Sequence, residues 1–318
     1  MIKVLDKYKI FNIIELSLLG LSITADAIAV FTLNFKDKLI VPVIGASLFF
    51  CTAVGVKYLK LRDIKDNILT NVTHSIHEID HHLRNEFYKM FDTKKKNQMD
   101  TDSIENYINR CGDIVSRNLS NGIYKMVGSK IRVIVKLFEF DSEKSEIIHS
   151  CAEKDIINSC LEKIKMRSIG KSVNGNQIEL TSDSYFLTEN TLYVEALKVI
   201  VEDDKFLYSD TRDLLKDYKK RYQKRVFNYP RNDWFIEDKG VIIVPISDEK
   251  HTWYTTGSSE SQIIGLIKIV SDSYSTFNQE NIQKAIIMMA QAAADSLYKC
   301  IDRQKYYFSL VVGKEGAA

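Results

Sequence analysis

Two cationic side chains within one short alternating segment are the first candidates for binding chemistry. Residues 131–140 alternate with the period of two that is typical of a β-strand. One face of this strand is uniformly apolar and carries Ile131, Val133, Val135 and Leu137. That face should meet helices, so we expect Arg132 and Lys136 to lie together on the opposite face.

A buried cation on that opposite face needs a partner, because desolvating the charge alone costs several kcal/mol. The partner is either an internal carboxylate, for which Glu189 is the candidate, or an anionic ligand such as a phosphate. In the second case Asn190 and Thr191 would add hydrogen bonds. Arginine suits phosphate because its planar guanidinium donates two parallel hydrogen bonds. The sequence leaves both alternatives open.

Histidine and cysteine give weaker signals. His74, His77 and His81 fall roughly on one face of a predicted helix at spacings that a metal ion could use, but solvent-facing histidines are far commoner. The five cysteines are scattered and include no C-x-x-C pair, which argues against a disulfide scaffold and fits a reducing compartment. Cys151 and Cys160 lack a supporting redox pattern. We therefore expect no metal site.

The sequence contains no recognisable catalytic constellation. A glycine-rich phosphate loop, a metal motif and a nucleophile elbow are all missing from it, so we expect no enzyme activity and no cofactor. The formal net charge of +2 gives no global basic field that would attract a nucleic-acid polymer.

Two apolar segments dominate the N-terminus. They run from Leu16 to Phe35 and from Leu39 to Val56, and each is about as long as a helix that crosses a ~30 Å hydrocarbon core. Only residues 36–38 separate them, so the two helices must be antiparallel neighbours. We expect residues 1–57 to form a transmembrane hairpin in the lipid bilayer.

Basic residues flank both ends of this predicted hairpin. They are Lys3, Lys7 and Lys9 before it, and Lys57, Lys60, Arg62 and Lys65 after it. By the positive-inside rule both chain termini should be cytosolic, at the inner membrane of a bacterium. A cleaved signal peptide and a buried soluble helix pair are the alternatives.

Asp26 falls near the middle of the first apolar segment. A carboxylate at that depth is costly unless it is neutralised, paired or hydrated. Small residues surround it and recur in the second segment, which lets helices approach closely. Asp26 therefore either faces the axis of a homo-oligomer or a pore, or is neutral and hydrogen-bonded within the hairpin.

Residues 58–103 are predicted to form a stalk helix and a polar linker. No proline or glycine interrupts the chain from Tyr58 to about Phe91, and apolar positions recur every eleven residues, which gives a nearly straight helical stripe. The predicted interface residues are Leu61, Ile68, Val72, Ile76, Ile79 and Leu83. A narrow stripe on a charged helix usually packs against another helix, so we expect self-association. Packing against the chain's own cytosolic domain is the alternative.

Residues 104–305 are predicted to form an α+β domain, followed by a tail at 306–318. The order is helix, strands, irregular middle, strands and helix. Gly240 to Ile246 and Ile263 to Val270 have the pattern of buried strands, and a helix begins near Asn278, a good N-cap. The two terminal helices should cover one face of an antiparallel sheet.

The run from Gly240 to Leu297 resembles the end of a GAF domain, and the order of elements from Ile104 matches as well. A group of bacterial GAF-like proteins is more similar still. Its short segments correspond here to Arg132-Val133 with Lys136-Leu137, Glu189-Asn190-Thr191, and Tyr229. The resemblance implies a small-molecule sensor whose pocket lies between the sheet and the irregular middle, lined by these residues. The family binds varied ligands, cyclic nucleotides among them.

The chain departs from the family pattern between Leu180 and Asp238, a long charged segment with a basic run at Lys219–Arg225. That run is a solvated helix face, a lid over an anionic ligand, or a contact with the membrane surface.

These observations favour a membrane-anchored sensor. A small anionic ligand, for instance a nucleotide second messenger, would bind the cytosolic domain and reorganise the hairpins of a homo-oligomer. By analogy with antiphage effectors, the hairpins could open a pore. The alternative is a non-gated scaffold or partner-binding protein whose GAF-like fold has lost its ligand.

Overall fold

The computed structural model describes the backbone of residues 37–95, 101–139, 164–180, 184–203, 205–223, 227, 238–247 and 263–315. Within these ranges the side-chain surroundings of some residues, among them 37–52, 61, 91–95 and 303–315, are not described. The chain divides into two compact units, Met1–Thr70 and Asn71–Ala318. Asp26, the first predicted span, and Tyr229 lie outside the described residues.

Helix α2 covers Asp37–Lys95 without interruption. The second apolar segment is therefore continuous with the predicted stalk, as expected from the absence of helix breakers after Tyr58. In the portion of the chain that can be described, no helix is long and apolar enough to cross a membrane. The linker is shorter than predicted, because α2 ends at Lys95 and the next helix begins at Thr101.

The second unit is an α+β fold, as predicted, built on one antiparallel sheet. The strands are β1 (Ile131–Glu139), β2 (Lys165–Val173), β3 (Asn176–Gln177), β4 (Tyr185–Phe186), β5 (Phe206–Tyr208), β6 (Gly240–Ile246) and β7 (Gly265–Ser271). Their order is β3-β2-β1-β7-β6-β5, with β4 also paired to β2. The strand predicted from the alternation of residues 131–140 is thus the centre of the sheet, between β2 and β7.

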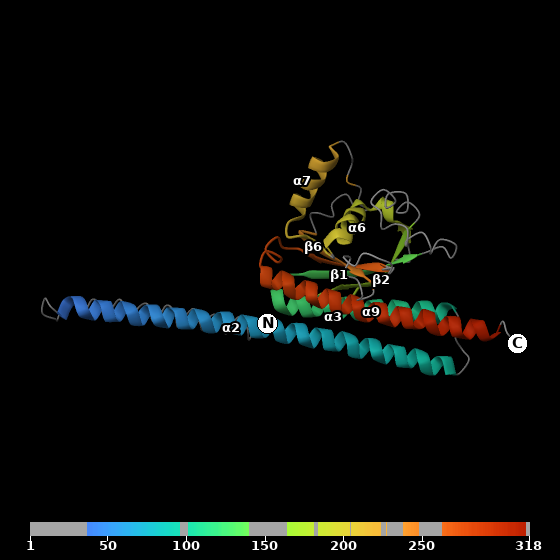
Figure 1. Ribbon diagram of the computed structural model, residues 1–318, viewed down its shortest axis with the longest axis horizontal. Coiled ribbons are helices and arrows are strands. Elements are labelled where there is room, and N and C mark those ends of the chain that lie inside the picture. The colour runs from blue at the N-terminus through green and yellow to red at the C-terminus, as the bar shows by residue number, and fades with distance from the viewer. Residues whose placement is uncertain are drawn as a thin grey trace. The chain divides into compact units, whose positions relative to one another are not determined.

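Two long helices cover one face of this sheet, as predicted (Figure 1). They are α3 (Thr101–Val127) and α9 (Glu280–Glu315), which also contact each other. The apolar face of β1 packs here, since Ile131, Val133 and Val135 are fully buried. The contact is close, because a Cβ added to Gly112 of α3 would overlap the backbone of Ile169 in β2.

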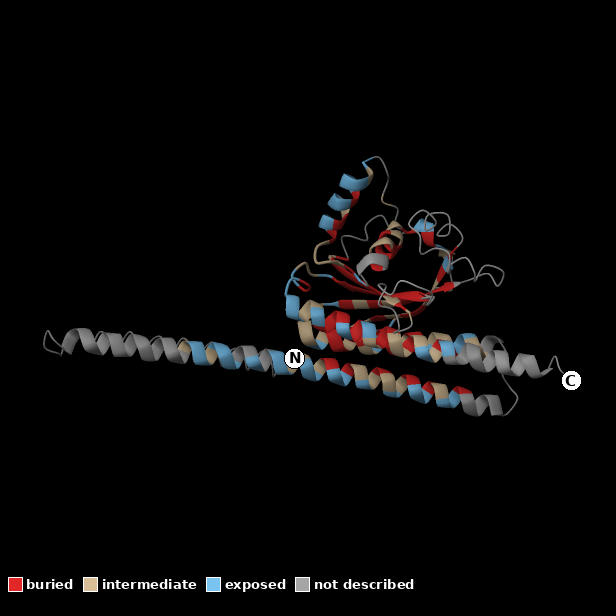
Figure 2. Ribbon diagram, viewed as in Figure 1, coloured by how far each residue is buried: buried red, intermediate tan, exposed pale blue. Residues whose placement is uncertain are grey.

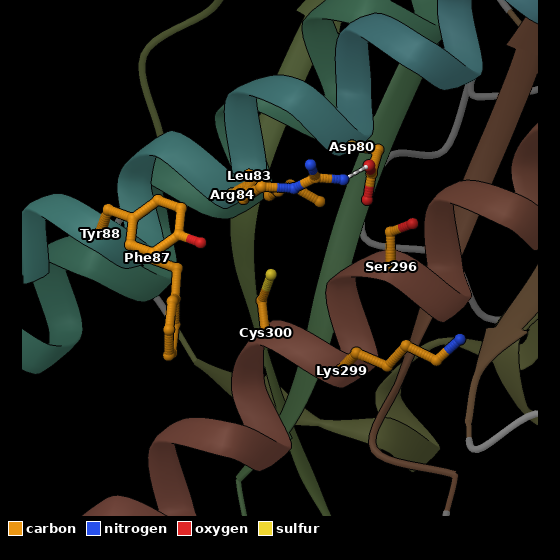
Figure 3. A pocket seen from close by; sticks show the side chains of 8 residues that line it. All are labelled: Asp80, Leu83, Arg84, Phe87, Tyr88, Ser296, Lys299 and Cys300. Atoms are coloured by element: carbon orange, nitrogen blue, oxygen red, sulfur yellow. Dashed lines mark hydrogen bonds and ion pairs between the residues drawn. The ribbon is translucent and has the colours of Figure 1, made fainter. Parts of the chain in front are cut away.

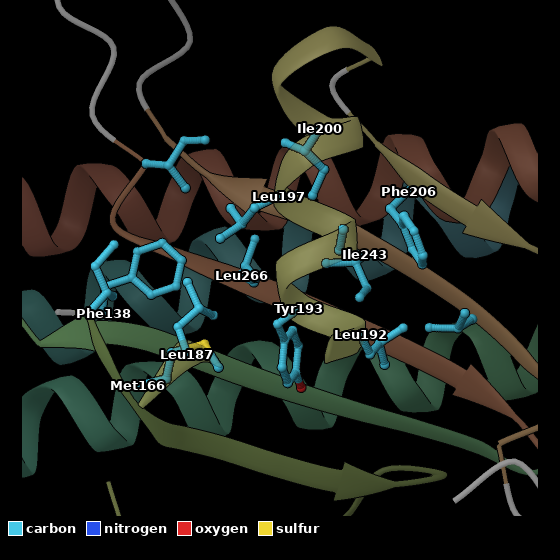
Figure 4. Packing of buried hydrophobic residues seen from close by; sticks show 14 of the residues in the cluster. Phe138, Met166, Leu187, Leu192, Tyr193, Leu197, Ile200, Phe206, Ile243 and Leu266 are labelled. Carbon is cyan, nitrogen blue, oxygen red and sulfur yellow. The ribbon is translucent and has the colours of Figure 1, made fainter. Parts of the chain in front are cut away.

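The other face of the sheet is covered by the middle of the chain. The sequence predicted an irregular segment there, but the structure contains regular elements. It contains the 3₁₀ turn η1 (Leu187–Glu189) and the helices α6 (Thr191–Asp203) and α7 (Thr211–Tyr222). Side chains of α6 pack onto β6 and β7 in a buried apolar cluster (Figure 4). The labelled members are Phe138, Met166, Leu187, Leu192, Tyr193, Leu197, Ile200, Phe206, Ile243 and Leu266. This helix was missed because its sequence is short and apolar on several sides.

Helix α2, from Asn71 onward, packs against α3 and α9 of its own chain (Figures 1 and 2). Its buried positions are Val72, Ser75, Ile79, Leu83, Glu86 and Met90, and the last three follow the first three after eleven residues. The predicted period is therefore confirmed. Val72, Ile79 and Leu83 are at most 3% exposed in the single chain, so these positions pack within the chain, which is the alternative to self-association.

The remaining predicted stalk positions are less enclosed. Ile76 and Ile68 are half-buried, and Leu61 is among the positions without a described side chain. The docking surface suits α2 because Ser75 lies directly against Gly122 of α3, where no side chain separates the two helices. Glu86 adds an ion pair with Arg110 of α3 at 3.4 Å.

Candidate anion-binding site

Lys136 is a buried lysine in the middle of the sheet, on the face covered by α6. The strand register places it between Ser168 of β2 and Leu266 of β7. The side chain is only 6% exposed, and its Nζ donates a hydrogen bond to the Ser168 hydroxyl at 2.9 Å. Lys136 therefore lies on the sheet face opposite the one that α3 and α9 cover, as the alternation of residues 131–140 predicts.

Aromatic rings, not a carboxylate, surround the Lys136 ammonium. Its Nζ lies 4.6 Å from the centroid of the Tyr185 ring and 5.7 Å from that of Tyr193. Ring faces attract a cation, but more weakly than a negative charge does. Among the described residues no acidic side chain pairs with Lys136. Glu189, the predicted internal partner, is exposed in η1.

The internal carboxylate of this face is Asp238, which the sequence did not identify. It accepts a hydrogen bond from Lys268 Nζ at 2.8 Å and one from Arg132 at 3.2 Å. Both Asp238 and Lys268 are nearly fully buried, at 2% and 1% exposure. The carboxylate that pairs with Arg132 is therefore Asp238 and not the predicted Glu189. Lys268 could have been found as the single charge in an otherwise apolar predicted strand.

The surroundings lower the pKa of Lys136 from its ordinary value of 10.5 to about 7. Burial is the main cause, and the positive charges of Lys268 and Lys171 add to it. Near neutral pH this amine is thus divided between its charged and its uncharged form. A negative charge beside it would favour the charged form and remove much of the cost of burying it.

The first turn of α6 borders the same place. Asn190 immediately precedes the helix, and its carbonyl oxygen accepts hydrogen bonds from the amides of Tyr193 and Val194. Its side chain is 2% exposed, and Oδ1 has no hydrogen-bond partner among the described residues. Thr191 is the first residue of α6. The structure therefore brings Asn190 and Thr191 to the start of the helix whose Tyr193 ring faces Lys136. Helix N-termini favour negative charge.

The other chemical candidates do not gather into a site. His74, His77 and His81 are exposed on α2, and among the described residues no group of three or more His, Cys, Asp or Glu could hold a metal ion. Cys111 and Cys300 are free thiols, whereas Cys151 and Cys160 are not described.

Two cavities that the structure describes lie in the helix layer. One, of about 420 Å³, lies between α2 and α9, and Figure 3 shows Cys300 of α9 pointing into it beneath Leu83 and Arg84 of α2. The other, of about 580 Å³, lies between α2 and α3 and includes Gln177. Neither touches Lys136. Both follow the edges of the α2 seam, where the helix surfaces separate.

The described part of the basic run is a solvated helix face. Lys219, Lys220 and Arg221 end α7 and are exposed, and Arg221 pairs with Glu195 of α6 at 3.7 Å. Asp210 caps the start of this helix by accepting a hydrogen bond from the Arg212 amide at 2.9 Å. Residues 224 and 225 are not described.

Neither a protein-family model nor a curated protein matches this chain. The function is therefore inferred from the chemistry of the site itself.

Proposed function

We propose that the domain after α2 is a sensor for a small anionic group, bound at Lys136 beside the start of α6. The observation that carries this proposal is a buried lysine with no acidic partner among the described residues. Such a residue costs stability, and a fold retains that cost where a ligand relieves it. The resemblance of its short segments to GAF-like sensors supports the same reading.

The ligand is a compact anion or the anionic group of a larger molecule, such as a nucleotide phosphate. Lys136 would donate to it, and the positive end of the helix dipole at the start of α6 would add to the attraction. Arg132 supports the site indirectly, because it already shares Asp238 with Lys268. Glu189 is exposed at this edge and would select against more highly charged ligands by repulsion.

The signal would pass through β1 to the helix layer and α2. The two sides of β1 alternate, so a shift at Lys136 moves Val135 and Leu137, which face away from it. α2 is one continuous helix from the second apolar segment to its seam on α3. We propose that this helix links the sensor to an N-terminal hairpin in the bilayer, that copies of the chain associate there, and that ligand binding rearranges the hairpins.

Thermal-shift measurements on the full chain test the proposal. Inorganic phosphate and a panel of cyclic and linear nucleotides would be added to the wild-type protein and to Lys136→Met. At least one anion should raise the melting temperature of the wild type and leave the variant unchanged. Equal shifts in both proteins would place the anion elsewhere.

A scaffold without a ligand is the second candidate, favoured by one observation. Side chains of α6 fill part of the sheet face with a packed apolar cluster, where a GAF-like sensor would hold its ligand (Figure 4). If the protein is a scaffold, none of the anions should raise its melting temperature. Lys136→Met should then leave the association between copies of the chain unchanged.

A further inference from the structure

The anion at Lys136 can be formed on the lysine itself. We propose that Lys136 is a carbamylation site: its amine combines reversibly with carbon dioxide, and the neighbouring cations of the sheet hold the carbamate that forms. This inference rests on the proposed function, because it names the anionic group that the site accepts.

The first reason is the charge pattern around the amine. Lys171 and Lys268 act on Lys136 as nearby positive charges, and no described carboxylate pairs with it. Nearby acids would repel a carbamate, whereas these two lysines would attract it. The Ser168 hydroxyl, 2.9 Å from Nζ, can donate a hydrogen bond to a carbamate oxygen.

The second reason is size. Lys136 is 6% exposed, and Tyr193, which covers it from α6, is 1% exposed. A linear, uncharged molecule of three atoms can reach such an enclosed amine without the desolvation cost that an incoming ion pays. A charged ligand of nucleotide size would have to displace the packing of α6.

The reaction is balanced without any further reagent. The lone pair of Nζ forms a bond to the carbon of CO₂, and one C–O π pair moves onto oxygen. Nitrogen then releases one proton to solvent, so that a neutral amine and CO₂ give a carbamate and H⁺. Only the uncharged amine can react, and burial keeps a large share of Lys136 uncharged near neutral pH.

Each element around Lys136 contributes polar or charged groups that set this equilibrium. They are Ser168 and Lys171 of β2, Arg132 of β1, Lys268 of β7, Tyr185 of β4, Tyr193 of α6, and Asp238 ahead of β6. Asp238 is the one acid of this set, and its hydrogen bonds go to Arg132 and Lys268. The set therefore has a net positive charge for the product to neutralise.

The test uses the full chain and isotopically labelled bicarbonate at pH 7.5 or thereabouts. Carbamates would be trapped with a trialkyloxonium reagent and located by peptide mass spectrometry. The adduct should be at least tenfold more abundant on Lys136 than on Lys165, an exposed lysine at the end of β2. It should be missing from Lys136→Arg, which keeps a cation but cannot form it.

Two results would overturn the inference. One is a wild-type protein with no adduct on Lys136, and the other is equal labelling of Lys136 and Lys165. If phosphate or a nucleotide nevertheless stabilises the wild type and not Lys136→Met, the proposed anion sensor stands and only the carbamate fails. If no anion stabilises the protein either, both proposals fail. Selective labelling of Lys136 over Lys165, lost in Lys136→Arg, supports the carbamate.

Discussion

Lys136 and Lys268 are buried lysines on the same face of neighbouring strands, but their surroundings differ. Lys268 bonds a buried carboxylate at 2.8 Å, whereas Lys136 bonds a hydroxyl and faces two aromatic rings. Removing one partner of a buried ion pair destabilises the folded protein, whereas removing a buried charge that has no partner stabilises it. The two lysines should therefore respond in opposite ways to the same substitution.

We predict that Lys136→Met raises the melting temperature of the ligand-free protein, because it removes a desolvated amine and keeps the volume. The pKa of Lys136 is lowered to about 7 in the fold, so below that pH the folded state carries the whole cost of the buried charge. Between about pH 7 and ~10.4 only the unfolded chain keeps its proton, and the free energy of unfolding rises with pH by up to ~1.4 kcal/mol per pH unit.

Melting curves from pH 6 to 9 would measure this effect. The gain from Lys136→Met should be greatest at pH 6 to 7 and should shrink as the pH rises. A variant that melts below the wild type at every pH would mean that the ammonium stabilises the fold.

We predict the reverse for Lys268→Met. Asp238 would keep only its longer bond to Arg132, and a buried carboxylate that loses its closest partner destabilises a protein by about 3 kcal/mol. Chemical denaturation of both proteins measures the difference. Lys165→Met, at an exposed lysine, should stay within about 0.5 kcal/mol of the wild type. A loss in the control as large as that in Lys268→Met would contradict the assignment.

At the scale of elements, helix α2 shows what periodicity can and cannot predict. Its apolar period of eleven was readable from the sequence and recurs in the buried positions. Ser75 and Glu86 belong to the same seam but could not be recognised, because a polar residue reads as surface until its partners, Gly122 and Arg110, are known. Periodicity identifies a face and leaves its occupant open.

Local alternation was enough to predict the central strand, but it could predict only part of the site. Alternation placed Arg132 and Lys136 on one face of a strand, and the structure agrees. Asp238 and Lys268 join them through antiparallel pairing across more than a hundred residues, which no local pattern encodes. Long-range pairing, and not side-chain type, was the missing information.

We predict that Gly122→Ala releases α2 from the helix layer. A Cβ at this position would lie 2.9 Å from both Ser75 Cβ and Met289 Cε, closer than side-chain carbons pack. Alanine is the better helix former, so α3 itself should not suffer. Hydrogen exchange of residues 71–90 should rise in the variant.

The paired substitution Ser75→Gly with Gly122→Ala controls for this prediction. It removes the Ser75 side chain and places a methyl group on the other side of the seam. It should restore much of the protection in residues 71–90, since the nearest atom that remains is the flexible end of Met289. Unchanged exchange in Gly122→Ala would show that α2 and α3 tolerate a wider spacing than the structure has.

At the scale of the whole molecule, the same helical stripe meets two environments. From Asn71 onward it is buried in the chain's own helix layer. In the first unit Val54, which precedes Ile76 by two repeats of eleven residues, is 50% exposed, and Ile68 is half-buried. An apolar face that continues in register beyond its own partner favours a second partner of the same kind. We therefore predict that, where copies of the chain associate through this stripe, they do so through the part of α2 before Asn71 and not through the whole predicted stalk.

Cysteine cross-linking in membranes tests this division in a full chain whose five natural cysteines are replaced. Ile68→Cys should form a dimer on mild oxidation, because its position lies on the stripe before Asn71 and is half-buried in a single chain. Leu83→Cys should stay monomeric, since that side chain is 1% exposed within its own chain. Dimers from both positions would mean that α2 leaves its seam and pairs along its whole length, and dimers from neither would remove the stripe as an oligomer interface. The experiment is then repeated with Leu83→Cys in the Gly122→Ala background, where α2 should be released from its seam. A dimer in that background would show that the released stripe can bind a second copy, as the proposed rearrangement of the hairpins requires.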